Sequence, residues 1–166
     1  PGLLQTRAYA RAVLRSVASE RWTEDEIDTR LEVRMTRQRE VLGKPDRPRL
    51  EVVLDEAVLR RVMESPDVMH EQLAHLVQIA SGPGVTIQVL PFTAGVSAAE
   101  GTFLILQFPN PGDGDVVYIE SPLTGHVLDR PNDIGPYRRA FERLQQTALN
   151  PDESLAMIEA AANNFR

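Results

Sequence analysis

The sequence predicts an α+β fold, in which a largely antiparallel sheet of about five strands is flanked by helices at both ends of the chain. Apolar residues recur at helical spacing near both termini, and most of these segments begin with a capping residue. Between residues 85 and 128 the pattern changes to that of short strands. The connections between the last three of these strands are short, which favours antiparallel neighbours for them.

Two helices are predicted before residue 45. The first covers about 6–17, where Tyr9 and later valines recur at helical spacing. The second begins at Thr23, because Thr23 and Glu26 have the spacing of a capping box, and it ends before Gly43.

The second helix carries a basic ridge beside its apolar stripe. At 100° per residue, Arg30, Arg34 and Arg37 fall within about 60° of one another. Three guanidinium groups on one side of a helix are candidates for contact with a partner or ligand.

The middle of the chain alternates strands and helices. A strand is predicted over 50–54 and a short helical turn over 56–62. A longer helix has Ser65 as N-cap and Pro66 in its first turn, and it ends at the Gly-Pro-Gly of 82–84. The remaining elements are strands over 85–90, 102–108, 116–120 and 125–128, followed by helices over about 137–148 and 150–165.

Composition restricts the functions that this chain can have alone. It has 166 residues, enough for one domain, and no cysteine, which suits a reducing compartment; we expect a cytoplasmic location and no membrane span. A net charge of −6 argues against direct DNA binding, which needs a basic surface. Because the first residue is Pro1 and not Met, we expect a fragment truncated at its N-terminus.

No set of residues has the spacing of a catalytic or metal site. His70 and His75 stand five positions apart on one predicted helix, so their rings point about 140° apart and do not share a metal ion. Glu56 and Glu120 follow strands and are the alternative candidates for a carboxylate pair, although Glu56 can equally pair with Arg60. We therefore expect no catalytic residue, no metal and no cofactor.

The segment 91–101 is a loop of small residues between two predicted strands. Such loops are often functional, and here Phe92 and Phe103 would supply apolar walls and Gln88 a polar contact for a ligand or partner. The alternative is a plain connection whose glycines only turn the chain.

Several separated motifs resemble one known family in their order along the chain. They are Pro1-Gly2-Leu3-Leu4-Gln5-Thr6-x-x-Tyr9-Ala10, Arg34-x-x-Arg37-Gln38, Asp55-Glu56-Ala57-Val58-Leu59-Arg60, Val68-Met69-x-x-Gln72-Leu73, the run 88–103 and Val116-Val117-Tyr118-Ile119-Glu120. The chain resembles the domain of unknown function that follows an Xre-type helix-turn-helix in actinobacterial, antitoxin-like transcriptional regulators. The resemblance implies a DNA-binding helix-turn-helix N-terminal to this chain, a small partner protein and no established enzymatic activity.

We therefore predict that residues 1–166 form a single regulatory domain, which binds a small-molecule effector or a small partner protein and reaches DNA only through the absent helix-turn-helix. One alternative is a homodimerisation domain that uses an apolar stripe on the terminal helices, and another is an enzyme that uses Glu56 and Glu120. The predicted ligand- or partner-binding residues are Arg34, Arg37, Gln38, Glu56, Gln88, Pro91, Phe92, Gly95, Gly101, Phe103, Tyr118 and Glu120.

Overall fold

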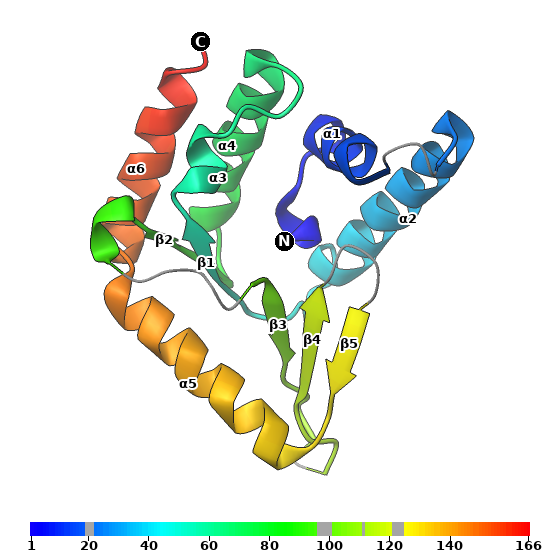
Figure 1. The fold of residues 1–166 in the computed structure, drawn as a ribbon, viewed down its shortest axis with the longest axis vertical. Coiled ribbons are helices and arrows are strands. Elements are labelled where there is room, and N and C mark those ends of the chain that lie inside the picture. Colours follow the sequence, from blue (N-terminus) through cyan, green and yellow to red (C-terminus); the bar gives the residue numbers. More distant parts are fainter. Residues whose placement is uncertain (19–21, 96–100, 111, 121–124) are drawn as a thin grey trace. The chain divides into compact units, whose positions relative to one another are not determined.

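The computed structural model describes residues 1–18, 22–95, 101–110, 112–120 and 125–166 (Figure 1). The described chain is α+β, as predicted, and divides into two compact units. The first unit contains residues 1–89 and 149–166, and the second contains residues 90–148. Among the described helices, none has both the length and the apolar character needed to cross a bilayer.

A short 3-10 helix and two α-helices begin the first unit. They are η1 (Gly2–Leu4), α1 (Arg7–Ala18) and α2 (Glu24–Leu42). The predicted capping box is confirmed, because the Thr23 hydroxyl accepts from the Glu26 amide while the Glu26 carboxylate accepts from the Thr23 amide. Helices α1 and α2 pack through their own small core, composed of Ala10, Leu14, Ala18, Ile27, Leu31 and Met35.

The larger core of the first unit lies between a pair of strands and three helices. These elements are β1 (Leu50–Asp55), α3 (Ala57–Arg60), α4 (Pro66–Ala80), β2 (Val85–Leu90) and α6 (Pro151–Asn163). Helix α4 packs along α6, and the two run side by side in Figure 1. Their apolar sides enclose fully buried side chains, among them Leu59, Met69, Leu73, Val89 and Ile158.

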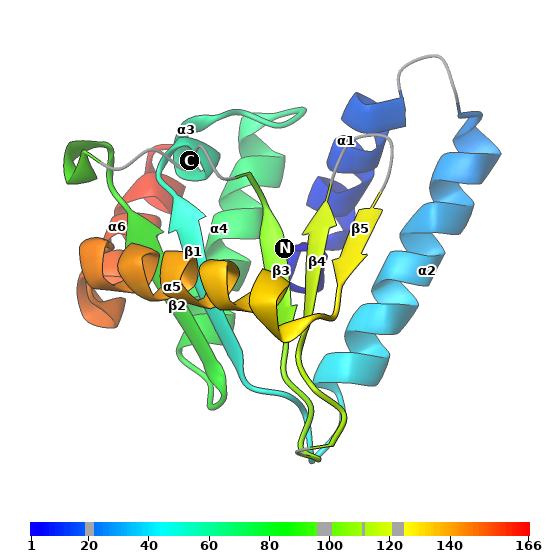
Figure 2. The same ribbon diagram turned by 60° about the horizontal axis from the view of Figure 1, so that its bottom comes forward.

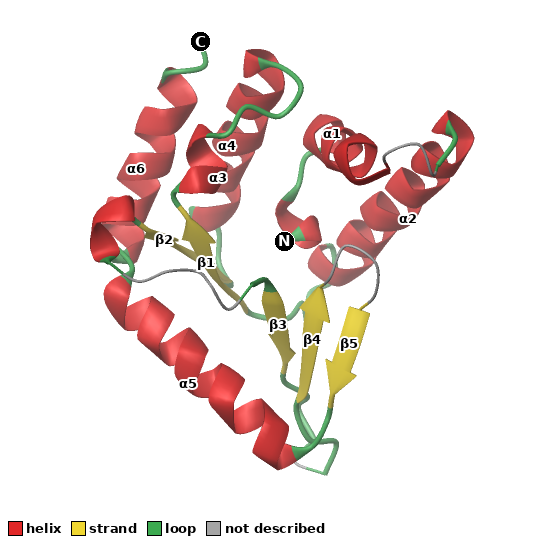
Figure 3. Cartoon of the chain, in the orientation of Figure 1, coloured by secondary structure: helices red, strands yellow, loops and turns green. Residues whose placement is uncertain are grey.

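The predicted five-stranded sheet is wrong. The strands form two small sheets, a parallel pair β1–β2 and an antiparallel set in the order β3–β4–β5 (Figure 3). Helices α3 and α4 lie between β1 and β2 in the sequence, and a helical crossover of this length brings two strands together in parallel. The strand patterns themselves did not indicate which strands pair.

The second unit contains the antiparallel sheet. Its elements are η2 (Phe92–Ala94), β3 (Phe103–Leu106), β4 (Val116–Glu120), β5 (Gly125–Leu128) and α5 (Pro131–Thr147). Figure 2 shows the three strands side by side and the chain passing from β5 directly into α5. The short-loop argument for antiparallel pairing is thus confirmed for these three strands.

The two faces of this sheet differ. Val117 is fully buried, and on the same side Phe103 meets Tyr137 of α5 edge-on, with ring centroids 5.2 Å apart. On the opposite face, Leu104, Tyr118 and Val127 lie in one cross-strand row and remain exposed.

Candidate ligand-binding site

The N-terminal segment 1–6 is held in the first unit by the side chain of Gln72. Its amide nitrogen donates to the carbonyl oxygen of Leu4 at 2.8 Å, and its oxygen accepts from the backbone amide of Thr6 at 2.7 Å. Gln72 is only 5% exposed, so these bonds lie in a water-poor environment where an unpaired amide is costly. The segment is therefore an integral part of the fold.

Helix α2 holds the same segment from another side. The amide nitrogen of Gln38 donates to the carbonyl oxygens of Leu3 at 2.7 Å and Gln5 at 3.0 Å. The guanidinium of Arg34 donates to the side-chain oxygen of Gln5. Three of the polar positions named by the sequence motifs, Arg34, Gln38 and Gln72, thus all bind residues 3–6.

Arg37 lies against the start of the segment. A Cβ atom on Gly2 would be 3.2 Å from a guanidinium nitrogen of Arg37 and 3.7 Å from the side chain of Arg34. Glycine therefore leaves room for the Arg37 guanidinium beside the backbone at this point. The third arginine of the predicted ridge points elsewhere, since the guanidinium of Arg30 stacks over Trp22 at 4.0 Å from the ring centroid.

A cavity of about 190 Å³ lies beside this segment. Its lining comes from segment 1–6, helix α1, the β1–α3 region and helix α4. The lining residues are Pro1, Leu4, Gln5, Tyr9, Leu54, Val58, Leu59, Gln72, Leu73 and Leu76. Six of these ten are leucine or valine, and none of the ten, all of which the structure describes, has a charged side chain.

Tyr9 lines the cavity and carries a hydroxyl group that can bind a ligand. Its hydroxyl forms no hydrogen bond with any residue that the structure describes, whereas both polar atoms of the Gln72 side chain are used. Burial raises the pKa of Tyr9 above its ordinary value, an effect that the positive charge of Arg61 opposes. The hydroxyl is therefore protonated at neutral pH and able both to donate and to accept.

Glu56 lies at the junction of β1 and α3. It is 8% exposed, and its carboxylate pairs with the guanidinium of Arg60 at 2.9 Å. The interpretation that Glu56 pairs with Arg60 one helical turn later is confirmed. Glu120, the other candidate carboxylate, lies exposed on β4 in the second unit.

Gln88 also has a structural contact in the first unit. Its amide nitrogen donates to the carbonyl oxygen of Leu149 at 3.0 Å, where the chain returns to this unit. The neighbouring Val89 amide donates to the hydroxyl of Ser154, and Leu149 donates to the carbonyl oxygen of Val89. Gln88 is thus part of the join between β2 and the start of α6.

The predicted loop 91–101 lies only partly within the described residues, because residues 96–100 are outside them. Pro91 precedes η2, and Gly95 ends it with a φ of 65°, a value that favours glycine. Phe92 is 63% exposed, whereas Phe103 packs against Tyr137. The two phenylalanines therefore have different surroundings in the second unit.

The remaining predicted residues of the second unit lie at its turns and on β4. Gly101 has a φ of 72° just before β3. Tyr118 extends over Gly125 of the neighbouring strand, where an added Cβ would clash with the phenol ring. Gly125 therefore makes room for the Tyr118 ring.

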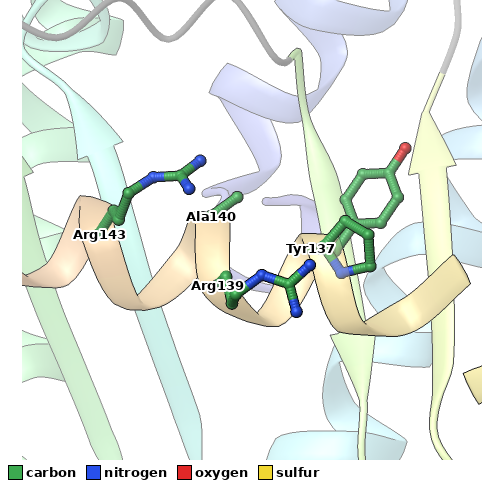
Figure 4. A pocket seen from close by; sticks show the side chains of 5 residues that line it. Tyr137, Arg139, Ala140 and Arg143 are labelled. Carbon is green, nitrogen blue, oxygen red and sulfur yellow. The ribbon is translucent and has the colours of Figure 1, made fainter. Parts of the chain in front are cut away.

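A second, open hollow of about 410 Å³ lies on helix α5 (Figure 4). Arg139 and Arg143, one helical turn apart, line it together with Pro136, Tyr137 and Ala140. It is larger than the cavity of the first unit, but it is formed by one helix and has no enclosing wall from another named element.

His70 and His75 have different surroundings on α4. Nδ1 of His70 is 2.9 Å from the carbonyl oxygen of Ala162, while Nε2 of His75 is buried without a hydrogen-bond partner. Burial lowers the pKa of His75, against an opposing effect of Glu71. Within the described ranges, no group of three or more histidine, aspartate or glutamate side chains has a geometry that could hold a metal ion.

The sequence reasoning missed the cavity itself. Its aliphatic lining is indistinguishable from ordinary core in a single sequence, because leucine spacing reports burial and not empty volume. The available signal was the motif Pro1–Ala10, which contains four of the lining residues, namely Pro1, Leu4, Gln5 and Tyr9.

Fold and site together define an α+β protein whose N-terminal segment is hydrogen-bonded beside a small, mainly aliphatic cavity. The chain belongs to the family described as Domain of unknown function (DUF5753), whose model matches residues 1–160. No curated protein and no solved structure matches the chain.

Proposed function

We propose that this chain is the non-catalytic regulatory domain of a cytoplasmic, Xre-type helix-turn-helix regulator. It binds a small-molecule effector or a small partner protein and thereby changes how the attached helix-turn-helix binds DNA. The observation that carries the proposal is the double role of segment 1–6, which borders the cavity and is held by Gln38 and Gln72.

Segment 1–6 lies at the end of the domain that would join the helix-turn-helix. The resemblance to actinobacterial, antitoxin-like regulators sets the helix-turn-helix N-terminal to this domain, so segment 1–6 would be its connection. A ligand that packs against Leu4 favours the held form of the segment over a released form. A difference in ligand affinity between these two forms is sufficient to couple the cavity to DNA binding.

The net charge of the chain also supports DNA binding by the attached helix-turn-helix and not by this domain. The chain has a net charge of −6, and non-specific DNA affinity depends on basic side chains that replace counterions. DNA contact therefore belongs to the attached domain.

The test uses the parent regulator and measures its affinity for operator DNA by fluorescence anisotropy. Replacing Gln38 and Gln72 by leucine releases segment 1–6, and we expect at least a threefold change in operator affinity. Replacing Gln78, exposed on α4, by leucine is the matched control and leaves the affinity unchanged. Equal affinities in all three proteins, or tight binding of duplex DNA by residues 1–166 alone at physiological salt, would overturn the proposal.

A second candidate function is homodimerisation, but not through the terminal helices. Helix α6 buries Ile158, Ala161 and Ala162 within the first unit, so its apolar stripe is used inside the chain. An exposed apolar row on the antiparallel sheet, formed by Leu104, Tyr118 and Val127, could instead face its own copy. Sedimentation equilibrium tests this candidate: a dimer that Val127→Glu dissociates supports it, and a monomer at millimolar concentration excludes it.

A further inference from the structure

The cavity beside segment 1–6 selects its ligand by charge. The lining residues, all within the described part of the chain, are aliphatic or uncharged. A carboxylate, ammonium or phosphate that entered would lose hydration without meeting an opposite charge on any lining side chain, which is costly in a mainly aliphatic site. Nucleotides, sugar phosphates and free amino acids are therefore poor ligands.

The volume of the cavity limits the size of its ligand. The cavity volume is about 190 Å³, below the roughly 300–1,000 Å³ of sites that hold drug-sized molecules. An apolar protein cavity of about 150 Å³ is known to accept benzene. A ligand of roughly six to ten non-hydrogen atoms therefore fits this space.

Tyr9 can supply a hydrogen bond to the ligand. It lines the cavity and its hydroxyl is uncommitted among the described residues, while the Gln72 amide is used by Leu4 and Thr6. Tyr9 is partly buried, and a polar ligand atom beside it would replace water as the partner of its hydroxyl.

We infer that the cavity binds an uncharged small molecule with an apolar body of roughly six to ten atoms and one hydroxyl or carbonyl oxygen placed at Tyr9. This inference rests on the proposed function for its biological meaning and on the cavity alone for its chemistry. The ligand would stabilise segment 1–6 by packing on Leu4.

The test compares four probes of one size on residues 1–166. They are benzyl alcohol, toluene, benzoate and benzylammonium, with dissociation constants measured by ligand-observed NMR. We expect benzyl alcohol to bind at least tenfold more tightly than either ion. Toluene should bind roughly three- to tenfold more weakly than the alcohol, the change expected for one uncharged hydrogen bond.

Two substitutions in the lining, with one control outside it, test whether the probes bind in the cavity. Val58 lines the cavity and is 41% exposed. The larger ring of Val58→Phe can therefore occupy the cavity, and binding of benzyl alcohol should be lost. Val62→Phe is the matched control, because Val62 is 51% exposed and outside the lining, and it should bind normally. Tyr9→Phe should bring the affinities for benzyl alcohol and toluene within about twofold.

The inference is overturned if benzoate binds as tightly as benzyl alcohol, or if Val58→Phe leaves binding unchanged in a folded protein. No saturable binding of any probe also overturns it. Failure of the proposed function alone would give another result. Benzyl alcohol would then bind to the cavity, but the affinity of the parent regulator for operator DNA would be the same with and without benzyl alcohol.

Discussion

The side-chain oxygen of Gln72 accepts a hydrogen bond from the backbone amide of Thr6 at 2.7 Å, across 66 positions of the sequence. The bond is buried, and the same side chain donates to the carbonyl oxygen of Leu4. One side chain of α4 therefore satisfies two backbone groups of the N-terminal segment and fixes the border of the cavity.

Replacing Gln72 by leucine should lower the free energy of unfolding of the first unit by about 2–4 kcal/mol, because two buried backbone groups lose their partners. Trp22, the single tryptophan, belongs to this unit and reports urea unfolding by fluorescence. Gln78→Leu on the exposed side of the same helix should change stability by less than about 0.5 kcal/mol. Equal effects of the two substitutions would show that the Gln72 bonds are not formed in solution.

In the second unit, Phe103→Ala should destabilise the antiparallel sheet by about 2 kcal/mol, since it removes the edge contact with Tyr137 and part of the packing on α5. Phe92→Ala should have almost no effect, because Phe92 is 63% exposed. Hydrogen exchange of the β4 amides measures the difference locally. Faster exchange in both variants would contradict the packing described for Phe103.

The pKa of His75 is lower in the folded chain than its ordinary value of 6.5, because burial disfavours the charged ring. The unfolded chain therefore binds more protons as the pH falls from 6.5 through the folded pKa, and the free energy of unfolding should fall over that range. His75→Leu should flatten this part of the pH profile relative to the natural chain. Two profiles that stay parallel would mean that His75 is not buried in its neutral form.

The capping box of α2 gives a further prediction. Thr23→Ala removes the acceptor of the Glu26 amide, and the thermal unfolding followed by circular dichroism should show a loss of about 1 kcal/mol. Thr36→Ala, exposed in the middle of the same helix, is the control and should cost less than half as much. A larger effect at Thr36 than at Thr23 would refute the capping role.

Local signals predicted most of the elements. The capping box at Thr23 and the Ser65 N-cap followed by Pro66 place helix starts where the structure has them. These signals are local because each depends on hydrogen bonds within one turn of helix.

Strand pairing was not predictable in the same way. A strand such as β1 shows that it is extended and partly buried, but its partner β2 follows 30 residues later, after two helices. The pairing depends on how those helices pack, which one strand's side-chain alternation does not report. The antiparallel set was predicted only where short connections limited the choices.

The candidate site was predicted in part. Arg34, Arg37 and Gln38 were named from motifs, and the structure gathers them on segment 1–6, where Arg34 and Gln38 hold the chain and Arg37 lies beside Gly2. Their role was hidden because their partners are backbone atoms of Leu3 and Gln5 and the side chain of Gln5, distant in sequence. Phe92 and Phe103, predicted as two walls of one pocket, have separate surroundings.

Ligand binding in the cavity beside segment 1–6 is tested most directly by a methyl NMR titration of residues 1–166 with benzyl alcohol. We expect saturable chemical-shift changes at the methyl groups of residues that line the cavity, namely Leu54, Val58, Leu73 and Leu76, and the loss of these changes in Val58→Phe. Shifts confined to residues 90–148, or no saturable shift at any methyl group, would contradict the claim that this chain binds ligands beside its N-terminal segment.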